Sequence, residues 1–149
     1  MYIEVAAHRG NVCDYPENTM PAYRSAYEIG ADMIELDLQM TKDGEIVLIH
    51  DPDLERTSDV SGKIRELNYD EILRADVGIK RGEAFKGIRV PTLRQFCELA
   101  VQENPTMQFN FEFKDYFTNL YVSLAIINSS LVPITMIFGP FSFLEIIKS

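Results

Sequence analysis

Two acidic residues, Glu35 and Asp37, are separated by one position within an otherwise apolar run of the sequence. If this run is a β-strand, alternate residues project from the same face, so the two carboxylates form one cluster. Two like charges about 4 Å apart repel by about 4 kcal/mol at an effective dielectric constant of about 20. A raised pKa, a cationic side chain or a divalent ion would relieve this repulsion, and carboxylate oxygens suit Mg²⁺ or Ca²⁺. We favour the metal ion.

A histidine, His50, follows this run after the dipeptide Asp43-Gly44, which is typical of a hairpin turn. A two-residue turn at that dipeptide would place Asp37 directly opposite His50, on the same face of the sheet. A register that differs by one residue would send His50 to the opposite face. The sequence therefore predicts that the histidine joins the acids, on the condition that the turn has two residues.

The elements that must position these residues alternate between strands and helices. Apolar patterns and cap signals predict strands over 2–8, 31–40 and 107–115, a helix that begins after Asn18 or Thr19 and ends at Gly30, a short helical stretch over 69–75, and a helix capped by Thr92. The alternation favours a parallel α/β architecture, in which polar residues at the carboxyl ends of strands usually belong to a site.

The chain has 149 residues, a length typical of one domain, and a net charge of −9 from 14 Lys and Arg against 23 Asp and Glu. It has no basic run or repeated aromatic platform, so nucleic acid is not an expected partner. An anionic substrate stays compatible with this charge, because local cations or a metal ion can reverse the field at a site. Cys13 and Cys97 do not suggest a disulfide framework, and the first residues lack a signal-peptide pattern, so we expect a reduced, cytoplasmic protein.

Five short motifs occur in order along the chain: HRG at 8–10, PENT at 16–19, IELD at 34–37, HDP at 50–52 and FEFKD at 111–115. Each motif alone has an ordinary structural explanation, since a single histidine is usually structural and PENT is a good helix cap. Together they resemble the glycerophosphodiester phosphodiesterase family. The resemblance implies a TIM-type (β/α) barrel, an α/β fold, that hydrolyses glycerophosphodiesters such as glycerophosphocholine to sn-glycerol 3-phosphate and an alcohol.

The resemblance also implies a role for each motif residue. It assigns Glu35, Asp37 and Glu112 as ligands of Mg²⁺ or Ca²⁺, His8 and His50 as general acid and base, Arg9 and Lys114 as phosphate contacts, and Glu17 and Asn18 as supporting residues. These residue types suit the chemistry, because a phosphodiester needs its developing charge neutralised and two protons moved near neutral pH. The expected partner is therefore a small glycerophosphodiester.

The composition changes after Asp115, because residues 116–144 contain no charged residue and the family motifs do not continue there. We therefore expect residues 1–115 to form the N-terminal part of a barrel, with an irregular excursion over 53–90, and residues 116–149 to form an apolar tail. The barrel is then incomplete in this chain. Polar residues and prolines interrupt the tail, which argues against a membrane span. Strands within 120–127 and 132–138 and a terminal helix over 141–149 are expected to pack on the half-barrel.

Two functions from different classes follow from this pattern. The first is metal-dependent phosphodiester hydrolysis, either by this chain alone or completed by association with another chain through the open edges of the barrel. The second is a catalytically silent remnant that keeps the motifs without a closed barrel. A related lyase that acts on phosphoinositides or sphingolipids is a third interpretation, which a stable cyclic phosphate product would support.

Overall fold

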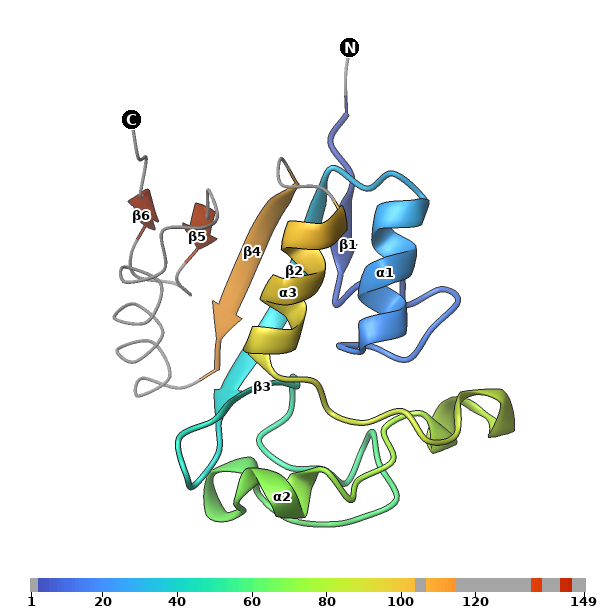
Figure 1. Ribbon diagram of the computed structural model, residues 1–149, viewed down its shortest axis with the longest axis vertical. Helices are drawn as coiled ribbons and strands as arrows, with labels where there is room; N and C mark the ends of the chain where they lie inside the picture. Colours follow the sequence, from blue (N-terminus) through green and yellow to red (C-terminus); the bar gives the residue numbers. More distant parts are fainter. Residues whose placement is uncertain (1–2, 104–106, 115–134, 138–142, 146–149) are drawn as a thin grey trace.

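The computed structural model describes residues 3–103, 107–114, 135–137 and 143–145. Strands and helices alternate, and two helices cover one face of a small sheet (Figure 1). The elements of this part are β1 (Ala6–His8), α1 (Met20–Glu28), β2 (Met33–Met40), β3 (Ile46–Leu48), α2 (Tyr69–Ile72), α3 (Leu93–Glu103) and β4 (Gln108–Phe113), with short 3₁₀ helices over Ile64–Glu66, Ile79–Arg81 and Glu83–Phe85. They overlap the segments that the sequence predicted, although the first strand begins only at Ala6.

Strand β2 is the centre of the sheet. It pairs with β1 and β4 in parallel orientation and with β3 in antiparallel orientation. The register places Glu35 beside His8 of β1 and Asn110 of β4, and it places Asp37 beside Glu112. Because the carboxyl ends of parallel strands meet at the same edge, polar side chains from β1, β2 and β4 gather on this side of the sheet.

The two covering helices begin at the residues that carry cap signals. The hydroxyl of Thr19 accepts the backbone N–H of Ala22, and Pro21 lies in the first turn of α1. At the start of α3, Thr92 and Gln95 each donate a backbone N–H to the side chain of the other. These bonds satisfy amide groups that have no partner within the helix, so the local sequence determines where both helices start.

The core lies between the sheet and helices α1 and α3. Its strand side is formed by alternate residues of β2 and β4, namely Ile34, Leu36, Leu38, Phe109 and Phe111. The ring of Phe96 from α3 packs edge to face on Phe109, with centroids 5.2 Å apart, and on Tyr23 of α1 at 4.9 Å. The prediction that the apolar residues of this strand face away from Glu35 and Asp37 is therefore confirmed.

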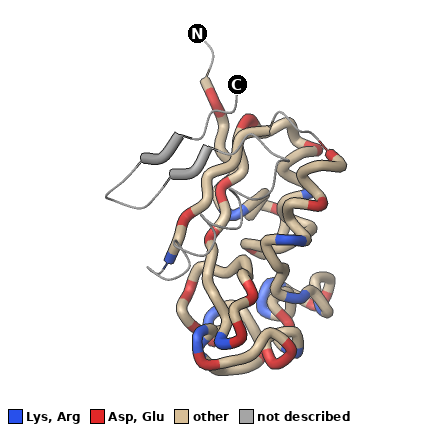
Figure 2. Tube along the Cα trace, turned by 60° about the vertical axis from the view of Figure 1, so that its left-hand side comes forward, with Lys and Arg blue, Asp and Glu red and all other residues tan. Residues whose placement is uncertain are grey.

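Residues 53–90 fold around a second, smaller apolar cluster. Its members are Leu54, Ile64, Ile72, Ala75, Val77 and Val90, together with Val47 of β3 and Ile49, which directly follows this strand. Eight of the 14 Lys and Arg residues lie in this segment together with eight acids, and both kinds of charge are mixed in the lower part of Figure 2. The segment is thus formally neutral, and the net charge of −9 belongs to the rest of the chain.

The turn between β2 and β3 corrects the predicted register. Leu38 is opposite Leu48, so the loop contains three residues, 42–44, instead of two. Gly44, which ends this loop, has a φ of 88°, and it donates its backbone N–H to the carbonyl of Thr41, directly after β2. Such a three-residue loop with a left-handed last residue is a common hairpin connection. The prediction that Asp37 is directly opposite His50 is therefore wrong.

Two strands near the C-terminus, β5 (Thr135–Ile137) and β6 (Phe143–Glu145), pair antiparallel, and β5 lies beside β4 (Figure 1). A strand within 132–138 agrees with the prediction. The terminal helix predicted over 141–149 is wrong at 143–145, because the backbone there is extended and pairs with β5. The strand predicted within 120–127 lies outside the described residues. Among the helices of the described ranges, none has the length and apolar character needed to cross a bilayer.

Candidate active site

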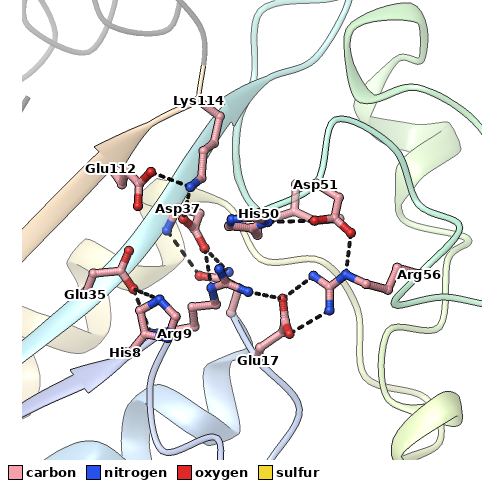
Figure 3. Close-up of polar contacts among 12 residues, drawn as sticks. His8, Arg9, Glu17, Glu35, Asp37, His50, Asp51, Arg56, Glu112 and Lys114 are labelled. Atoms are coloured by element: carbon pink, nitrogen blue, oxygen red, sulfur yellow. Dashed lines mark hydrogen bonds and ion pairs between the residues drawn. The ribbon is translucent and has the colours of Figure 1, made fainter. Parts of the chain in front are cut away.

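Three carboxylates converge on the face of β2 and β4 that is turned away from the core (Figure 3). Glu35 and Asp37 of β2 and Glu112 of β4 each offer one oxygen, and these oxygens lie within 4.8 Å of one another. Glu35 and Asp37 are buried, whereas Glu112 is partly exposed. The expected meeting of the three side chains is therefore found in the structure.

Glu35 is the least compensated of the three carboxylates. Burial, together with the nearby charge of Asp37, raises the pKa of Glu35 to about 7. Its Oε2 accepts the backbone N–H of Arg9 at 2.8 Å, and Nε2 of His8 is 3.9 Å from the same oxygen. Its Oε1 is buried and has no hydrogen-bond partner among the described residues. A buried carboxylate oxygen in this position destabilises the fold unless a proton or a cation reaches it.

Asp37 is fully buried but surrounded by donors. Nε of Arg9 lies 3.1 Å from its Oδ2, and Nδ2 of Asn18 donates to the same oxygen at 2.7 Å. Nζ of Lys114 lies 2.9 Å from Oδ1 of Asp37 and 2.5 Å from Oε1 of Glu112. Burial lowers the pKa of Lys114, but its bonds to Glu112 and Asp37 raise it more, so the net shift is upward. Lys114 therefore stays charged between the two carboxylates.

The donor set fits a hard divalent cation. All three groups offer carboxylate oxygens, which Mg²⁺ and Ca²⁺ prefer, and they come from two adjacent strands that hold them at fixed spacing. Lys114 contacts Asp37 and Glu112, but no cationic side chain among the described residues contacts Oε1 of Glu35. A divalent ion held by the three carboxylates would supply this missing compensation.

The turn after β1 fixes Arg9 against the carboxylates. Arg9 and Gly10 both have left-handed backbone conformations, with φ of 59° and 83°. A Cβ on Gly10 would lie 2.8 Å from atoms of Ala22 in α1, so a larger residue would push the turn away from the helix. The tight turn lets both the backbone and the side chain of Arg9 reach the acids. It also leaves the His8 side chain 63% exposed beside Glu35.

Glu17 and Asn18 lie in the loop that leads into α1. A hydrogen bond from Arg56, and then the charges of Arg56 and Arg9, lower the pKa of Glu17, whose Oε1 is 3.1 Å from Nη1 of Arg9. Asn18 has a left-handed backbone with φ of 53°, and its N–H donates to the carbonyl of Arg9 at 3.0 Å. Its side-chain Oδ1 accepts the hydroxyl of the buried Tyr23 at 2.7 Å. Asn18 therefore connects the core of the fold to the cluster.

His50 belongs to the same group of side chains, although it does so by a different route from the predicted one (Figure 3). Pairing in β3 ends before His50, and the side-chain amide of Gln39 donates to the carbonyls of Ile49 at 3.3 Å and His50 at 2.9 Å. Nδ1 of His50 is 2.6 Å from Oδ1 of Asp51. Hydrogen bonds with Arg56 and then with His50 lower the pKa of Asp51, so this carboxylate accepts. In the neutral form of the ring, Nδ1 of His50 therefore carries the proton and Nε2 is the unprotonated nitrogen.

Three residues that hold this arrangement were not identified from the sequence, namely Gln39, Asp51 and Arg56. Gln39 is two residues after Asp37 in the same strand, so its side chain is expected on the same face, and Asp51 directly follows His50. The sequence therefore pointed to both residues. Arg56 had none, because one of its partners lies 39 positions earlier in the chain. Only the folded chain brings that pair together.

The fold and the polar cluster together define part of a TIM-type α/β barrel with a site on one face of its sheet. The chain belongs to the glycerophosphoryl diester phosphodiesterase family, whose family model matches residues 8–121. It is 50% identical over 95 residues to a glycerophosphodiester phosphodiesterase of Caldanaerobacter subterraneus. The matched region covers 64% of this chain and 39% of that relative. It is also 40% identical over 112 residues to a glycerophosphodiester phosphodiesterase of Bacillus altitudinis. This match covers 75% of this chain and 45% of the relative.

Solved structures of the family share the fold over most of this chain. The glycerophosphodiester phosphodiesterase of Agrobacterium tumefaciens matches with a TM-score of 0.82 and 29% identity, over 93% of this chain and 58% of its own. A phosphodiesterase of Oleispira antarctica, in complex with the product sn-glycerol-3-phosphate, matches with a TM-score of 0.83 and 27% identity over the same shares. This chain therefore contains part of the barrel, and it spans less than half the length of the two curated relatives above.

Proposed function

We propose that the site hydrolyses glycerophosphodiesters to sn-glycerol 3-phosphate and an alcohol, with Mg²⁺ or Ca²⁺ held by Glu35, Asp37 and Glu112. The observation that carries the proposal is the meeting of these three carboxylates with Arg9 and Lys114 on one face of the sheet. The product bound to the Oleispira antarctica relative supports the substrate class.

Arg9 and Lys114 would hold the phosphate in this mechanism. The guanidinium of Arg9 offers a planar fork that can bond two phosphate oxygens, whereas the ammonium of Lys114 acts as a point charge. Both are already held by Asp37, so they need little rearrangement when charge develops on the phosphoryl group. The bound metal ion would add Lewis-acid stabilisation of the same developing charge.

His8 and His50 would move the two protons of the reaction. One imidazole takes the proton of the attacking hydroxyl or water, and the other, protonated, gives its proton to the leaving alkoxide. His50 offers Nε2 for this because Asp51 occupies Nδ1. His8 is exposed next to Glu35, and the chain contains no third histidine.

Release of sn-glycerol 3-phosphate from glycerophosphocholine is the direct test. We expect the purified chain to release it with Mg²⁺ or Ca²⁺, and we expect EDTA or Glu112→Gln to abolish the release. Binding of the ion is measured separately by calorimetry. A folded, metal-loaded protein without turnover would contradict the proposal, and a stable cyclic phosphate product would indicate a lyase instead.

A catalytically silent remnant is the second candidate, and one observation favours it. The chain covers only 39% and 45% of the curated relatives compared above, so the rest of their barrel has no counterpart in the matched region. This candidate predicts metal binding without turnover. Addition of the unmatched portion of a relative as a second polypeptide should leave such a remnant inactive, whereas restored activity would support a phosphodiesterase that is completed by association through its open edges.

A reduced cellular compartment, the cytoplasm, agrees with this function. Its support is that Cys13 and Cys97 are both free thiols, Cys13 at the surface and Cys97 partly buried. Disulfides are rare in proteins that stay in a reducing environment, so two free thiols agree with such a location. Fractionation of the native host followed by detection of the chain would test the location.

A further inference from the structure

Arg56 comes from the 53–90 segment and places its guanidinium between two carboxylates of the site loops (Figure 3). Its Nη1 donates to Oε2 of Glu17 at 2.9 Å, and its Nη2 donates to Oε1 of Glu17 at 2.6 Å. Its Nε donates to Oδ2 of Asp51. The hydrogen bond with Glu17, followed by that with Asp51, raises the pKa of Arg56. All three guanidinium nitrogens therefore have carboxylate partners.

Each of these carboxylates also holds a residue that the proposed reaction uses. Oδ1 of Asp51 is 2.6 Å from Nδ1 of His50, and Oε1 of Glu17 is 3.1 Å from Nη1 of Arg9. Arg56 is thus the middle of a continuous chain of contacts that runs from His50 to Arg9. Without its guanidinium, Glu17 and Asp51 would lose the group that holds them at a fixed distance from each other.

The backbone around Arg56 is held in place by buried neighbours. Leu54 and Ser58 on either side are almost completely buried, and Ser58 donates its backbone N–H and its hydroxyl to the carbonyl of Leu54 at 3.0 and 2.9 Å. The apolar cluster of the 53–90 segment therefore fixes where the Arg56 side chain starts. This connects the segment, which supplies no residue to the carboxylate trio, to the geometry of the site.

We propose that Arg56 is a positioning residue, which holds the tautomer and orientation of His50 through Asp51 and the orientation of Arg9 through Glu17. Stabilisation of the fold alone does not explain the contacts of Arg56, since its side chain is 48% exposed and exposed ion pairs contribute little to stability. The geometry needs a planar guanidinium that forms two hydrogen bonds with Glu17 and a third with Asp51. A lysine in this place would keep the charge and lose that geometry.

The inference rests on the proposed function only in treating His50 as a proton-transfer group and Arg9 as a phosphate contact, so its test does not use turnover. Long-range ¹H–¹⁵N correlation spectra report which ring nitrogen of a histidine carries the proton. The chain has only His8 and His50, and His50→Gln assigns the signals. We expect His50 to be protonated on Nδ1 in the natural chain. In Arg56→Lys and Arg56→Ala, nothing would hold Asp51 against Nδ1, so we expect the ratio of Nδ1–H to Nε2–H forms to fall on the order of tenfold, the effect of losing the hydrogen bond between Asp51 and His50.

Arg65→Lys is the matched control. Arg65 lies in the same segment and is exposed, and it makes no ion pair with another described residue. We expect the spectra of its variant to equal those of the natural chain. Unchanged His50 signals in a folded Arg56→Lys protein would overturn the proposal, and so would the loss of the fold in both Arg56 variants, because this would assign Arg56 a structural role. If turnover is absent but the His50 signals shift, the proposed function fails and this inference stands.

Discussion

The two faces of the β2–β4 pair are built from alternate residues of the same strands, yet they differ in charge and in their contribution to stability. One face, with Leu36 and Phe111, is closed by α1 and α3 and contains no charge. The other face, with Asp37 and Glu112, collects acids and cations at short distances. Apolar burial stabilises by about 25 cal/mol per Å², whereas buried carboxylates destabilise unless they are paired.

This difference indicates that one face stabilises the fold and that the other face carries the proposed active site. On the polar face, the pKa of Glu35 is raised by burial, and Oε1 of Glu35 has no hydrogen-bond partner among the described residues. Shifted pKa values are common at functional sites, because a side chain that is positioned to bind a ligand is energetically unfavourable when the ligand is absent. Variants of the two faces should therefore respond in opposite ways.

The largest effect is expected from the histidines. His50→Ala should lower the rate of phosphodiester hydrolysis by roughly 10²- to 10⁴-fold, and His8→Ala should do the same, because each removes a proton-transfer group. The melting temperature of both variants should stay close to that of the natural chain, since neither ring is part of the core. Parallel losses of activity and thermal stability would instead indicate structural histidines.

A pair of adjacent substitutions on β4 separates the two faces directly. Phe111→Ala should lower the free energy of unfolding by about 3–5 kcal/mol, because it leaves a cavity in the core between β4 and α3. Its neighbour on the polar face, Glu112→Ala, should abolish the stabilisation by Mg²⁺ or Ca²⁺ and change the metal-free stability far less. Urea denaturation with EDTA and with added metal measures both. Equal destabilisation of the two metal-free variants would show that the faces are not separate.

The pKa of Glu35 predicts a pH dependence for the metal-free protein. Its folded value of about 7 lies above the ordinary value of 4.5, so the folded state binds more protons between these values. Stability should therefore fall as the pH rises through this window. Glu35→Gln should remove this slope and raise the free energy of unfolding near pH 8 by on the order of 2 kcal/mol, with little effect near pH 4. Denaturation in EDTA at both pH values gives the result, and a destabilised Glu35→Gln protein at the higher pH would contradict the prediction.

A smaller effect is expected from Lys114, which brings a positive charge to two of the three carboxylates. Lys114→Met should raise the affinity for Mg²⁺ or Ca²⁺ by roughly fivefold, because it removes a like charge from beside the ion. Calorimetric titration measures the dissociation constant. Lys86→Met is the control, since Lys86 pairs with the exposed Glu83 away from the site. Weaker metal binding by Lys114→Met would mean that Lys114 mainly holds Asp37 and Glu112 in place.

Much of the local structure could be read from the sequence because the signals were local. The alternation around Glu35 and Asp37 predicted their common face, and the cap residues of α1 predicted where that helix starts. The β2–β3 register could not be read in this way, since a two-residue and a three-residue loop both suit the same Asp-Gly dipeptide. His50 still joins the cluster because the amide of Gln39 holds the bend that follows the strand.

The sequence by itself determined the residue types of the site, the side of each strand that they occupy and the family to which their order belongs. Only the tertiary structure decided which cation meets which carboxylate. Arg56 reaches Glu17 across 39 positions, and Lys114 reaches Asp37 from a different strand. The physical reason is that strand periodicity acts between near neighbours, whereas an ion pair between distant segments depends on how the sheet, the helices and the 53–90 segment pack.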